Sequence, residues 1–362
     1  EITCRDWSSD VCSSDLDQRF EGLLLGWRVT GDPWLFESAK AMADWCLGAW
    51  KDGSPRDGGI FGNLGMVQSR AAYVAKMHLA LFDITGDRAY ADNAVRLGEW
   101  ASRTHEPEGW WVMDPTSRDS RAYRCTPIFT GYISQGLWPL ERRTHAAPLR
   151  DALLGAADWY LSRQEDARGS NPGSFPNSYW YGSAGSESAP VPVSGNYATT
   201  QHAASALLEA FHATGKQEYF YGANAAWADV LTHQTPEGGI PLENTAENSV
   251  WSHVLVESLP RFASIAERDR LPIVMGSKNG MPGTSFMGRG ASWDGHAFRF
   301  GLKYKSDAPV AVRIYFPEGK PRTITIDGVA TEVVFWDATS HVASFRLRTS
   351  GRFRSVNVVV NC

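Results

Sequence analysis

The sequence lacks the features that mark membrane proteins and nucleic-acid-binding proteins. Within its 362 residues, no apolar run approaches the roughly 18–20 residues that a membrane-spanning helix requires. No stretch is rich in Lys or Arg, and the net charge is −5 at pH 7, so the basic surface that binds nucleic acid is missing. We therefore expect neither a membrane nor a nucleic-acid partner, and we make no prediction of the oligomeric state.

Cysteine is scarce, and two of the five cysteines lie in a segment that does not look like protein. Residues 4–16, CRDWSSDVCSSDL, have no hydrophobic period and no signal-peptide layout, and they resemble the conceptual translation of a DNA-sequencing adapter. We expect residues 1–16 to be an artefact without a structural role. We expect the chain to be an N-terminally truncated metagenomic fragment that lacks its signal region. We expect a secreted or periplasmic location for the parent protein.

The three other cysteines, Cys46, Cys125 and Cys362, show no metal-ligand spacing and form no disulfide framework. We expect Cys46 and Cys125 to be small buried hydrophobes. The sequence accordingly predicts no metal and no cofactor.

Aromatic residues, in contrast, are abundant: the chain has 15 Trp, 12 Tyr and 16 Phe. Most of them should fill the core. Trp and Tyr also combine a large apolar ring with a polar tip, which suits stacking on sugar rings. The composition thus keeps a sugar-binding role open.

A short motif recurs along the chain. Residues 25–32 (LGWRVTGD), 81–87 (LFDITGD) and 210–216 (AFHATGK) align, and 140–144 (LERRT) is a degenerate copy. In the first, second and degenerate copies a tryptophan preceded by an acid lies 15 residues after the repeat threonine, at Trp45, Trp100 and Trp159. In the last copy the spacing to Trp227 is 13 residues.

The Thr-Gly-Asp motif predicts a tight turn between two helices. Gly31 and Gly86 would take the left-handed conformation just past a helix C-terminus, where a Cβ is disfavoured. Asp32 and Asp87 would cap the next helix, and Pro33 suits its first position. Each repeat is therefore expected to be a helical hairpin.

The connections between hairpins are long, at about 49–65, 104–125, 164–196 and 233–248. Alternation of short turns with long connections places every long connection on one face of the helices. Connections held by a rigid scaffold are where functional residues usually lie.

The motifs EGLLLGWRVTGD (21–32) and LALFDITGDRAY (79–90), with the Gly-rich connections, are similar to the α/α toroid of six-hairpin glycosidases and toroid polysaccharide lyases. The resemblance covers residues 17–268. It implies a mostly α fold: an (α/α) toroid of helical hairpins, incomplete here at four hairpins plus a helix over 249–267. Residues 272–362 read as period-2 strands and predict a C-terminal β-sandwich-like domain.

By this resemblance, the active cleft lies where the long connections enter the inner helices, and the partner is a carbohydrate substrate. The catalytic candidates on these connections and helix starts are Tyr197, His202, Arg118, Asp114, Asp119, His253 and Glu243. The candidates for substrate binding are Trp110, Trp111, Arg121, Tyr123, Asn177, Tyr179, Tyr181, Asn196, Trp251, Asn63 and Arg70.

Two chemistries fit these residues. A lyase acting on a uronic acid needs a base such as Tyr197 or His202, and Arg or Asn to stabilise the enolate. A glycoside hydrolase needs paired carboxylates, for which Asp114 or Asp119 could face Glu243 or Glu247. The balance of Arg, Tyr, Asn and His narrowly favours β-elimination, and a non-catalytic glycan-binding toroid is a third possibility.

Structural roles compete with each assignment. Trp110 and Trp111 would also serve as a hydrophobic plug between helices. His202 and His253 would also serve as packing histidines, and Asp119 with its flanking arginines as a surface ion cluster.

Overall fold

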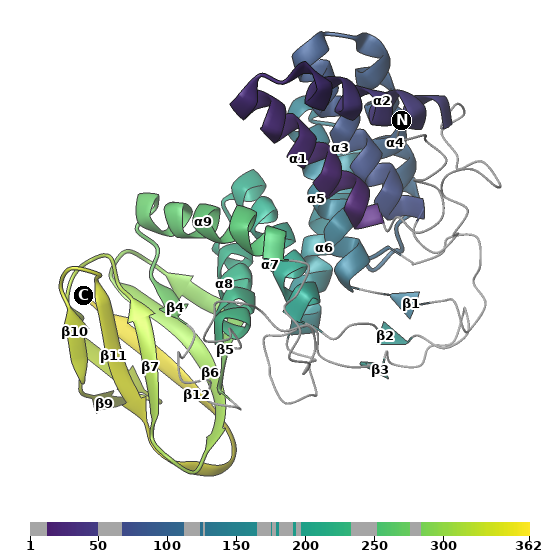
Figure 1. Cartoon of the computed structure of the whole chain (residues 1–362). Coiled ribbons are helices and arrows are strands. Elements are labelled where there is room, and N and C mark those ends of the chain that lie inside the picture. The colour runs from purple at the N-terminus through teal and green to yellow at the C-terminus, as the bar shows by residue number, and fades with distance from the viewer. Residues whose placement is uncertain are drawn as a thin grey trace. The chain divides into compact units, whose positions relative to one another are not determined.

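A computed structural model describes residues 13–49, 67–111, 124–125, 127–164, 175, 179–180, 191–192, 197–232, 252–275 and 284–362 (Figure 1). Its helices are α1 (Ser13–Thr30), α2 (Pro33–Ala49), α3 (Val67–Thr85), α4 (Arg88–Arg103), α5 (Pro127–Thr144), α6 (Ala147–Gln164), α7 (Tyr197–Thr214), α8 (Gln217–Thr232) and α9 (Ser252–Arg268). The described part of the chain thus has four hairpins and α9, as the repeat predicts. Helix α1 begins at Ser13, so the last four residues of the adapter-like segment are helical. None of the helices described is long and apolar enough to span a bilayer.

The turns inside the hairpins have the conformation that the motif predicts. Gly31, Gly86 and Gly215 have φ of 72°, 73° and 69°. In the degenerate copy, His145 takes the same left-handed place with φ of 50°. The Oδ1 atom of Asp87 accepts the N–H of Ala89 at 3.0 Å, which confirms the predicted helix cap.

The repeat threonine has a role that the sequence did not reveal. Thr85 donates its hydroxyl to the carbonyl of Leu81 at 2.8 Å and accepts the N–H of Asp87 at 3.2 Å. Thr30, Thr144 and Thr214 make the same two bonds in their copies. The hydroxyl therefore satisfies polar groups on both sides of the turn, which a helix end leaves without partners.

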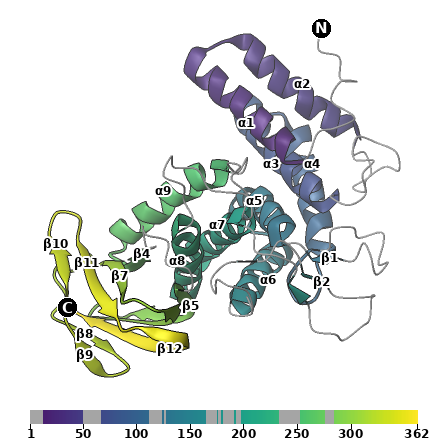
Figure 2. The ribbon, with the colours of Figure 1, turned by 60° about the horizontal axis from the view of Figure 1, so that its bottom comes forward.

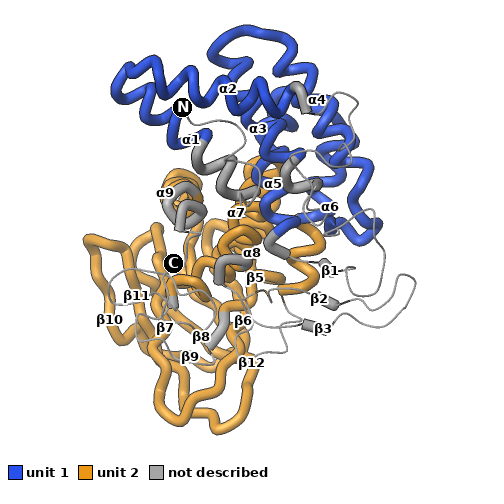
Figure 3. The backbone as a smooth tube through the Cα atoms, turned by 45° about the vertical axis from the view of Figure 1, so that its right-hand side comes forward, with its two compact units in different colours: residues 1–156, 180–190 blue, residues 157–179, 191–362 orange. Residues whose placement is uncertain are grey.

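The chain forms two compact units (Figure 3). The first comprises residues 1–156 and 180–190, and the second comprises 157–179 and 191–362. Their boundary at 156/157 falls inside α6, so this helix contributes to both units.

In the first unit, α3 and α5 pack side by side and run in the same direction (Figures 1 and 2). Near their starts, the rings of Tyr73 and Tyr132 lie 5.6 Å apart. Near their ends, Arg143 forms an ion pair with Asp83. Contacts at both ends require parallel helices, so the starts of α3 and α5 lie at one end of this unit.

The second unit combines α7, α8 and α9 with two antiparallel sheets. One sheet has the order β10-β11-β7-β4 and the other β5-β6-β12-β8-β9. The strands are β4 (Ile273–Met275), β5 (Thr284–Trp293), β6 (Ala297–Ser306), β7 (Val310–Tyr315), β8 (Thr323–Ile326), β9 (Val329–Thr331), β10 (Phe335–Asp337), β11 (Val342–Leu347) and β12 (Ser350–Asn361). Elsewhere in the described chain, two-residue strands occur at β1 (Arg124–Cys125), which belongs to the first unit, and at β2 (Tyr179–Trp180) and β3 (Val191–Pro192).

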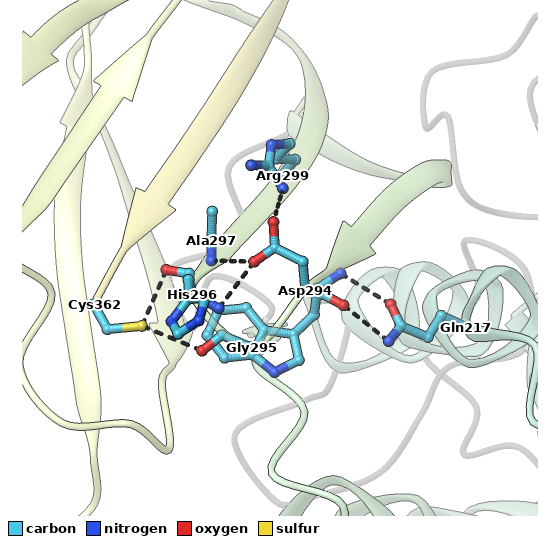
Figure 4. A network of polar contacts seen from close by, with 8 residues as sticks. Gln217, Asp294, Gly295, His296, Ala297, Arg299 and Cys362 are labelled. Atoms are coloured by element: carbon cyan, nitrogen blue, oxygen red, sulfur yellow. Dashed lines mark hydrogen bonds and ion pairs between the residues drawn. The ribbon is translucent and has the colours of Figure 1, made fainter.

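Two amide side chains of α8 attach this helix to the sheets. Gln217 both donates to the carbonyl and accepts from the N–H of Trp293, each at 2.9 Å (Figure 4). Asn224 makes the same pair of bonds with Val274, at 2.8 and 2.9 Å. A Cβ added at Gly288 of β5 would lie 2.4 Å from the Tyr221 carbonyl oxygen, so helix and strand are in close contact. The strands of residues 272–362 belong to the same compact unit as α7, α8 and α9. A separate β domain over these residues therefore stays a prediction.

The turn between β5 and β6 is held by one carboxylate. Asp294 accepts the N–H groups of His296 and Ala297 at 2.9 and 2.8 Å and pairs with Arg299 at 2.6 Å (Figure 4). Arg299, and then the two backbone N–H groups, lower the pKa of Asp294 below its ordinary value. The thiol of Cys362 lies 3.0 Å from the His296 carbonyl and fixes the last residue at this turn.

Candidate functional site

The candidate functional residues belong to the starts of the inner helices α3, α5, α7 and α9 and to the connections that precede these helices in the sequence. The first unit contributes α3 and α5, whose starts lie at one end. The second unit contributes α7 and α9, which are joined by a bidentate ion pair between Glu209 and Arg261.

In the first unit, the connection after α4 is fastened to the start of α5. The backbone N–H of Trp111 donates to the Thr130 hydroxyl at 3.3 Å, and the Trp111 indole donates to the Ala101 carbonyl at 2.9 Å. Trp110 and Trp111 are buried, with exposures of 1% and 0%. This burial is what the hydrophobic-plug interpretation expects, since a ring must be exposed to stack on a sugar.

The second unit repeats the arrangement at the start of α7. The backbone N–H of Phe175 donates to the Thr200 hydroxyl at 3.0 Å. The Phe175 ring meets that of Tyr160 edge to face, 5.3 Å between centroids. Thr130 and Thr200 are each the fourth residue of their helix. The same contact, from a backbone N–H to a threonine hydroxyl, therefore joins each of two long connections to the first turn of an inner helix.

Sequence reasoning missed these threonines, although a signal was present. Both connections carry Gly-x-aromatic, at Gly109–Trp111 and Gly173–Phe175, and both next helices have Thr in the first turn. This shared pattern indicates a contact between each connection and the helix that follows it.

His202 lies in α7 and has no exposed surface. The neighbouring Thr200 and Gln201 are also fully buried. A buried histidine matches the packing interpretation, and the proposal that His202 acts as a base stays a prediction.

The other predicted residues are placed only in part. The backbone of Tyr197 begins α7, that of His253 follows the start of α9, Arg70 lies in the first turn of α3, and Tyr179 lies in β2. The remaining candidates lie outside the described residues: Arg118, Asp114, Asp119, Glu243, Arg121, Tyr123, Asn177, Tyr181, Asn196, Trp251 and Asn63. Their side-chain arrangement stays a prediction.

Asp229 of α8 has the most perturbed carboxyl in the described chain. Burial raises its pKa to about 8, and its Oδ2 atom is out of contact with solvent. A carboxyl that stays protonated at neutral pH can serve as a general acid. However, Asp229 occupies the place in the repeat that Trp45, Trp100 and Trp159 occupy elsewhere, which is a packing position. We therefore assign it no catalytic role.

No group of three or more His, Cys, Asp and Glu side chains that could hold a metal occurs among the residues that the structure describes. Cys46 is buried, as the sequence predicted, and burial raises the pKa of its thiol to about 12.

Comparison with known proteins places the fold. No family model and no curated protein matches the chain. Among solved structures, an inactive variant of an α-1,6-mannanase of Salegentibacter sp. HEL1_6, in complex with α-1,6-mannotetrose, is 15% identical with a TM-score of 0.52. The match covers 70% of this chain and 71% of the mannanase.

Two further structures give the same result. An unsaturated glucuronyl hydrolase specific for heparin has a TM-score of 0.52 at 10% identity, over 70% of this chain and 68% of that one. A UGL variant with dGlcA-Glc-Rha-Glc has a TM-score of 0.56 at 14% identity, over 72% and 71%. At such low identity these matches show the fold alone.

Proposed function

From the α/α-toroid fold of six-hairpin glycosidases, which this chain has, we propose that it is a carbohydrate-degrading enzyme whose active-site residues belong to the starts of the inner helices and the long connections before them. The observation that carries this proposal is the fastening of two long connections to the first turns of inner helices, by Thr130 and Thr200. Such anchors hold Trp111 and Phe175, one described residue of each connection, in fixed positions. Catalytic groups need that fixed geometry, because small displacements of reacting groups cost large factors in rate.

We propose hydrolysis of a glycosidic bond as the reaction. The mannanase and the glucuronyl hydrolase that share the fold both have hydrolytic names, which reverses the narrow preference for β-elimination drawn from residue types. One carboxylic acid would protonate the leaving oxygen, and a second carboxylate would act as nucleophile or activate water. Asp114 or Asp119 opposite Glu243 or Glu247 are the residues that we propose for these roles.

A uronic acid remains the proposed substrate class. The connection 112–123 carries Arg118 and Arg121, and a guanidinium binds a carboxylate with two parallel hydrogen bonds. The name of the glucuronyl hydrolase that shares this fold supports the same substrate class.

The test is to incubate the whole chain with a mannan, with uronate polysaccharides and with unsaturated uronate oligosaccharides. We expect new reducing ends without new ultraviolet absorbance from unsaturated uronates. New absorbance from an intact uronate polysaccharide would show that the reaction is elimination and not hydrolysis. Tyr197 and His202 would then be the candidate bases. A chain that cleaves none of these glycans contradicts the proposal.

Carboxamide variants identify the two carboxylates. Asp114→Asn, Asp119→Asn, Glu243→Gln and Glu247→Gln each remove one candidate, and loss of a true general acid or base lowers kcat by about 100- to 10,000-fold. Asp151→Asn, at an exposed position of α6, is the matched control and should leave kcat unchanged. If all four variants keep the wild-type kcat, the paired-carboxylate assignment is wrong.

A further inference from the structure

The outer helices are the second helices of the four hairpins, α2, α4, α6 and α8. In the described chain, a tyrosine links one outer helix to the next at two of the three junctions, α2 with α4 and α6 with α8. The acid before each repeat tryptophan is Asp44 on α2, Glu99 on α4 and Asp158 on α6. In the first unit, the Tyr90 hydroxyl of α4 donates to Asp44. In the second unit, the Tyr219 hydroxyl of α8 donates to the Oδ1 atom of Asp158 at 2.6 Å.

These two tyrosines occupy the same position in the repeat. Each follows the left-handed turn residue by four positions, and each is only 1% exposed. Burial, followed by the bond to Asp44, raises the pKa of Tyr90 to about 12. Burial, followed by the bond to Asp158, likewise raises the pKa of Tyr219. Both phenols therefore remain protonated donors, each with its ring enclosed and its hydroxyl on a carboxylate.

The place between α4 and α6 lacks this tyrosine. Leu149 stands four positions after His145, where the other copies have Tyr90 and Tyr219. Val95 stands where α2 has Lys40, whose ammonium pairs with Asp44 at 2.7 Å. The polar cluster of Lys, Asp and Tyr found on α2 and α4 is thus replaced by Val95, Glu99 and Leu149.

A cavity lies where the substitution removes the phenol. Its volume is about 340 Å³, and all its lining residues belong to the first unit. They are Val95, Glu99, Ser102, Arg103, Leu140, Thr144, Ala146, Pro148 and Leu149. Val95 and Pro148 supply its accessible apolar wall, because both are exposed, whereas Leu140 and Leu149 behind them are only 2% and 3% exposed. Glu99 contacts Arg103 at 3.9 Å, and both side chains are more than half exposed, so that pair is weak.

We propose that this cavity is a binding site for a small phenolic compound, with the aromatic ring against Val95 and Pro148 and the hydroxyl donating to Glu99. The chain supplies the precedent, because Tyr90 and Tyr219 place that same group at the corresponding points of the fold. The volume lies within the roughly 300–1,000 Å³ typical of ligand pockets. The longer Glu99 side chain, where the other copies have Asp, extends the acceptor further into the space that the missing ring leaves. The site is independent of the proposed glycosidase function.

The test uses 4-methylphenol, the tyrosine side chain as a free molecule, and the whole chain. We expect one site with Kd in the range of about 0.1–10 mM, the affinity open to a ligand of this size. Toluene, which lacks the hydroxyl, should bind at least about 10-fold more weakly, the loss expected for one hydrogen bond to a charged group. Equal affinity for the two compounds overturns the assignment to phenols.

Three variants locate the site. Leu149→Tyr restores the ring of the other copies and should abolish binding while leaving the protein folded. Glu99→Ala should reduce the preference for 4-methylphenol over toluene to about 1. Tyr90→Leu opens the matching space beside Asp44 and should raise the stoichiometry from one site to two. If Tyr90→Leu does not fold, the other two variants decide.

Two outcomes contradict the proposal outright. Unchanged binding in Leu149→Tyr places the ligand elsewhere on the protein. Tighter binding of N-acetyl-tyrosinamide than of 4-methylphenol would show that the cavity receives a tyrosine of a protein partner rather than a small phenol.

Discussion

Among single residues, His78 of α3 is the one whose charge is most directly tied to folding. Its Nε2 atom lies 2.9 Å from the Ala43 carbonyl, and its Nδ1 atom lies 2.8 Å from the amide nitrogen of Asn93. The first contact requires a proton on Nε2, and the second requires Nδ1 to accept. The ring is therefore neutral in the folded protein, and burial lowers its pKa to about 4.

This histidine predicts acid sensitivity. Unfolded His78 binds a proton near pH 6.5, whereas folded His78 does so only near pH 4. As pH falls between these values, the unfolded state gains protons and the free energy of unfolding drops by roughly 3 kcal/mol. Urea unfolding of the wild type at pH 7.0 and pH 4.5, in about equal salt, measures the drop.

The matched variant for this prediction is His78→Leu, because Leu23, Leu137 and Leu207 hold the same place in the other inner helices. It should be less stable at pH 7 through loss of two hydrogen bonds, yet show a smaller drop on acidification. His212→Leu, at an exposed site of α7, should retain the full drop. An unchanged drop in His78→Leu would assign the acid sensitivity to other groups.

Residue identity was predictable where one residue type is required. Gly31 and Gly86 follow from the left-handed turn that ends a helix. His145 was not predictable as a turn residue, because its φ of 50° is imposed by the hairpin around it rather than favoured by its side chain. Leu149 and Val95 look like ordinary apolar residues until the copies of the repeat are aligned.

At the scale of elements, the contact of α6 with the connection after α4 depends on two glycines. A Cβ added at Gly109 would lie 2.1 Å from the Gly155 carbonyl oxygen, and Gly109 has φ of 99°. A backbone carbonyl within a helix cannot move aside without breaking the helix. This crossing fixes the point from which Trp110 and Trp111 enter the core.

Gly109→Ala should therefore be strongly destabilising. We expect a loss of roughly 3 kcal/mol in the free energy of unfolding, from overpacking and an unfavourable backbone conformation together. Gly290→Ala is the control, because Gly290 also has positive φ, 77°, but faces open space. It should cost only about 1 kcal/mol. Equal losses, measured by urea unfolding, would show that the crossing with Gly155 is not tight.

Element types and order were predictable because the turn chemistry and the apolar period agree along the hairpins. The role of the helix starts was harder to predict from the sequence. Thr130 and Thr200 act through a hydroxyl that bonds a residue 19 or 25 positions away, and no local period encodes such a partner. The candidate residues in the connections have the same difficulty, since connections carry no repeating face.

At the scale of the whole molecule, α6 belongs to both compact units, which divide at residue 156. Helix formation is cooperative, because each new hydrogen bond depends on its helical neighbours. Melting α6 in one unit therefore weakens its other half. We infer that the two units unfold together.

Calorimetry of the wild type should accordingly show one unfolding transition. Insertion of two glycines between Ala156 and Ala157 interrupts α6 and should split the transition into two. The same insertion after Glu332, between β9 and β10, should leave a single transition at a similar temperature. Two transitions in the wild type would contradict the coupling through α6.

The bonds from Gln217 and Asn224 to the strands have a consequence for how such a protein can evolve. Each amide satisfies both the N–H and the carbonyl of one strand residue, so a sheet grafted onto another helix would lose all four bonds at once. Genetic recombination at the helix-to-strand junction near residue 270 would separate these partners. Exchange of the C-terminal part between related proteins should therefore succeed when the crossover point lies before α8. The segment that must be inherited as one piece then includes α8 as well as the sheets.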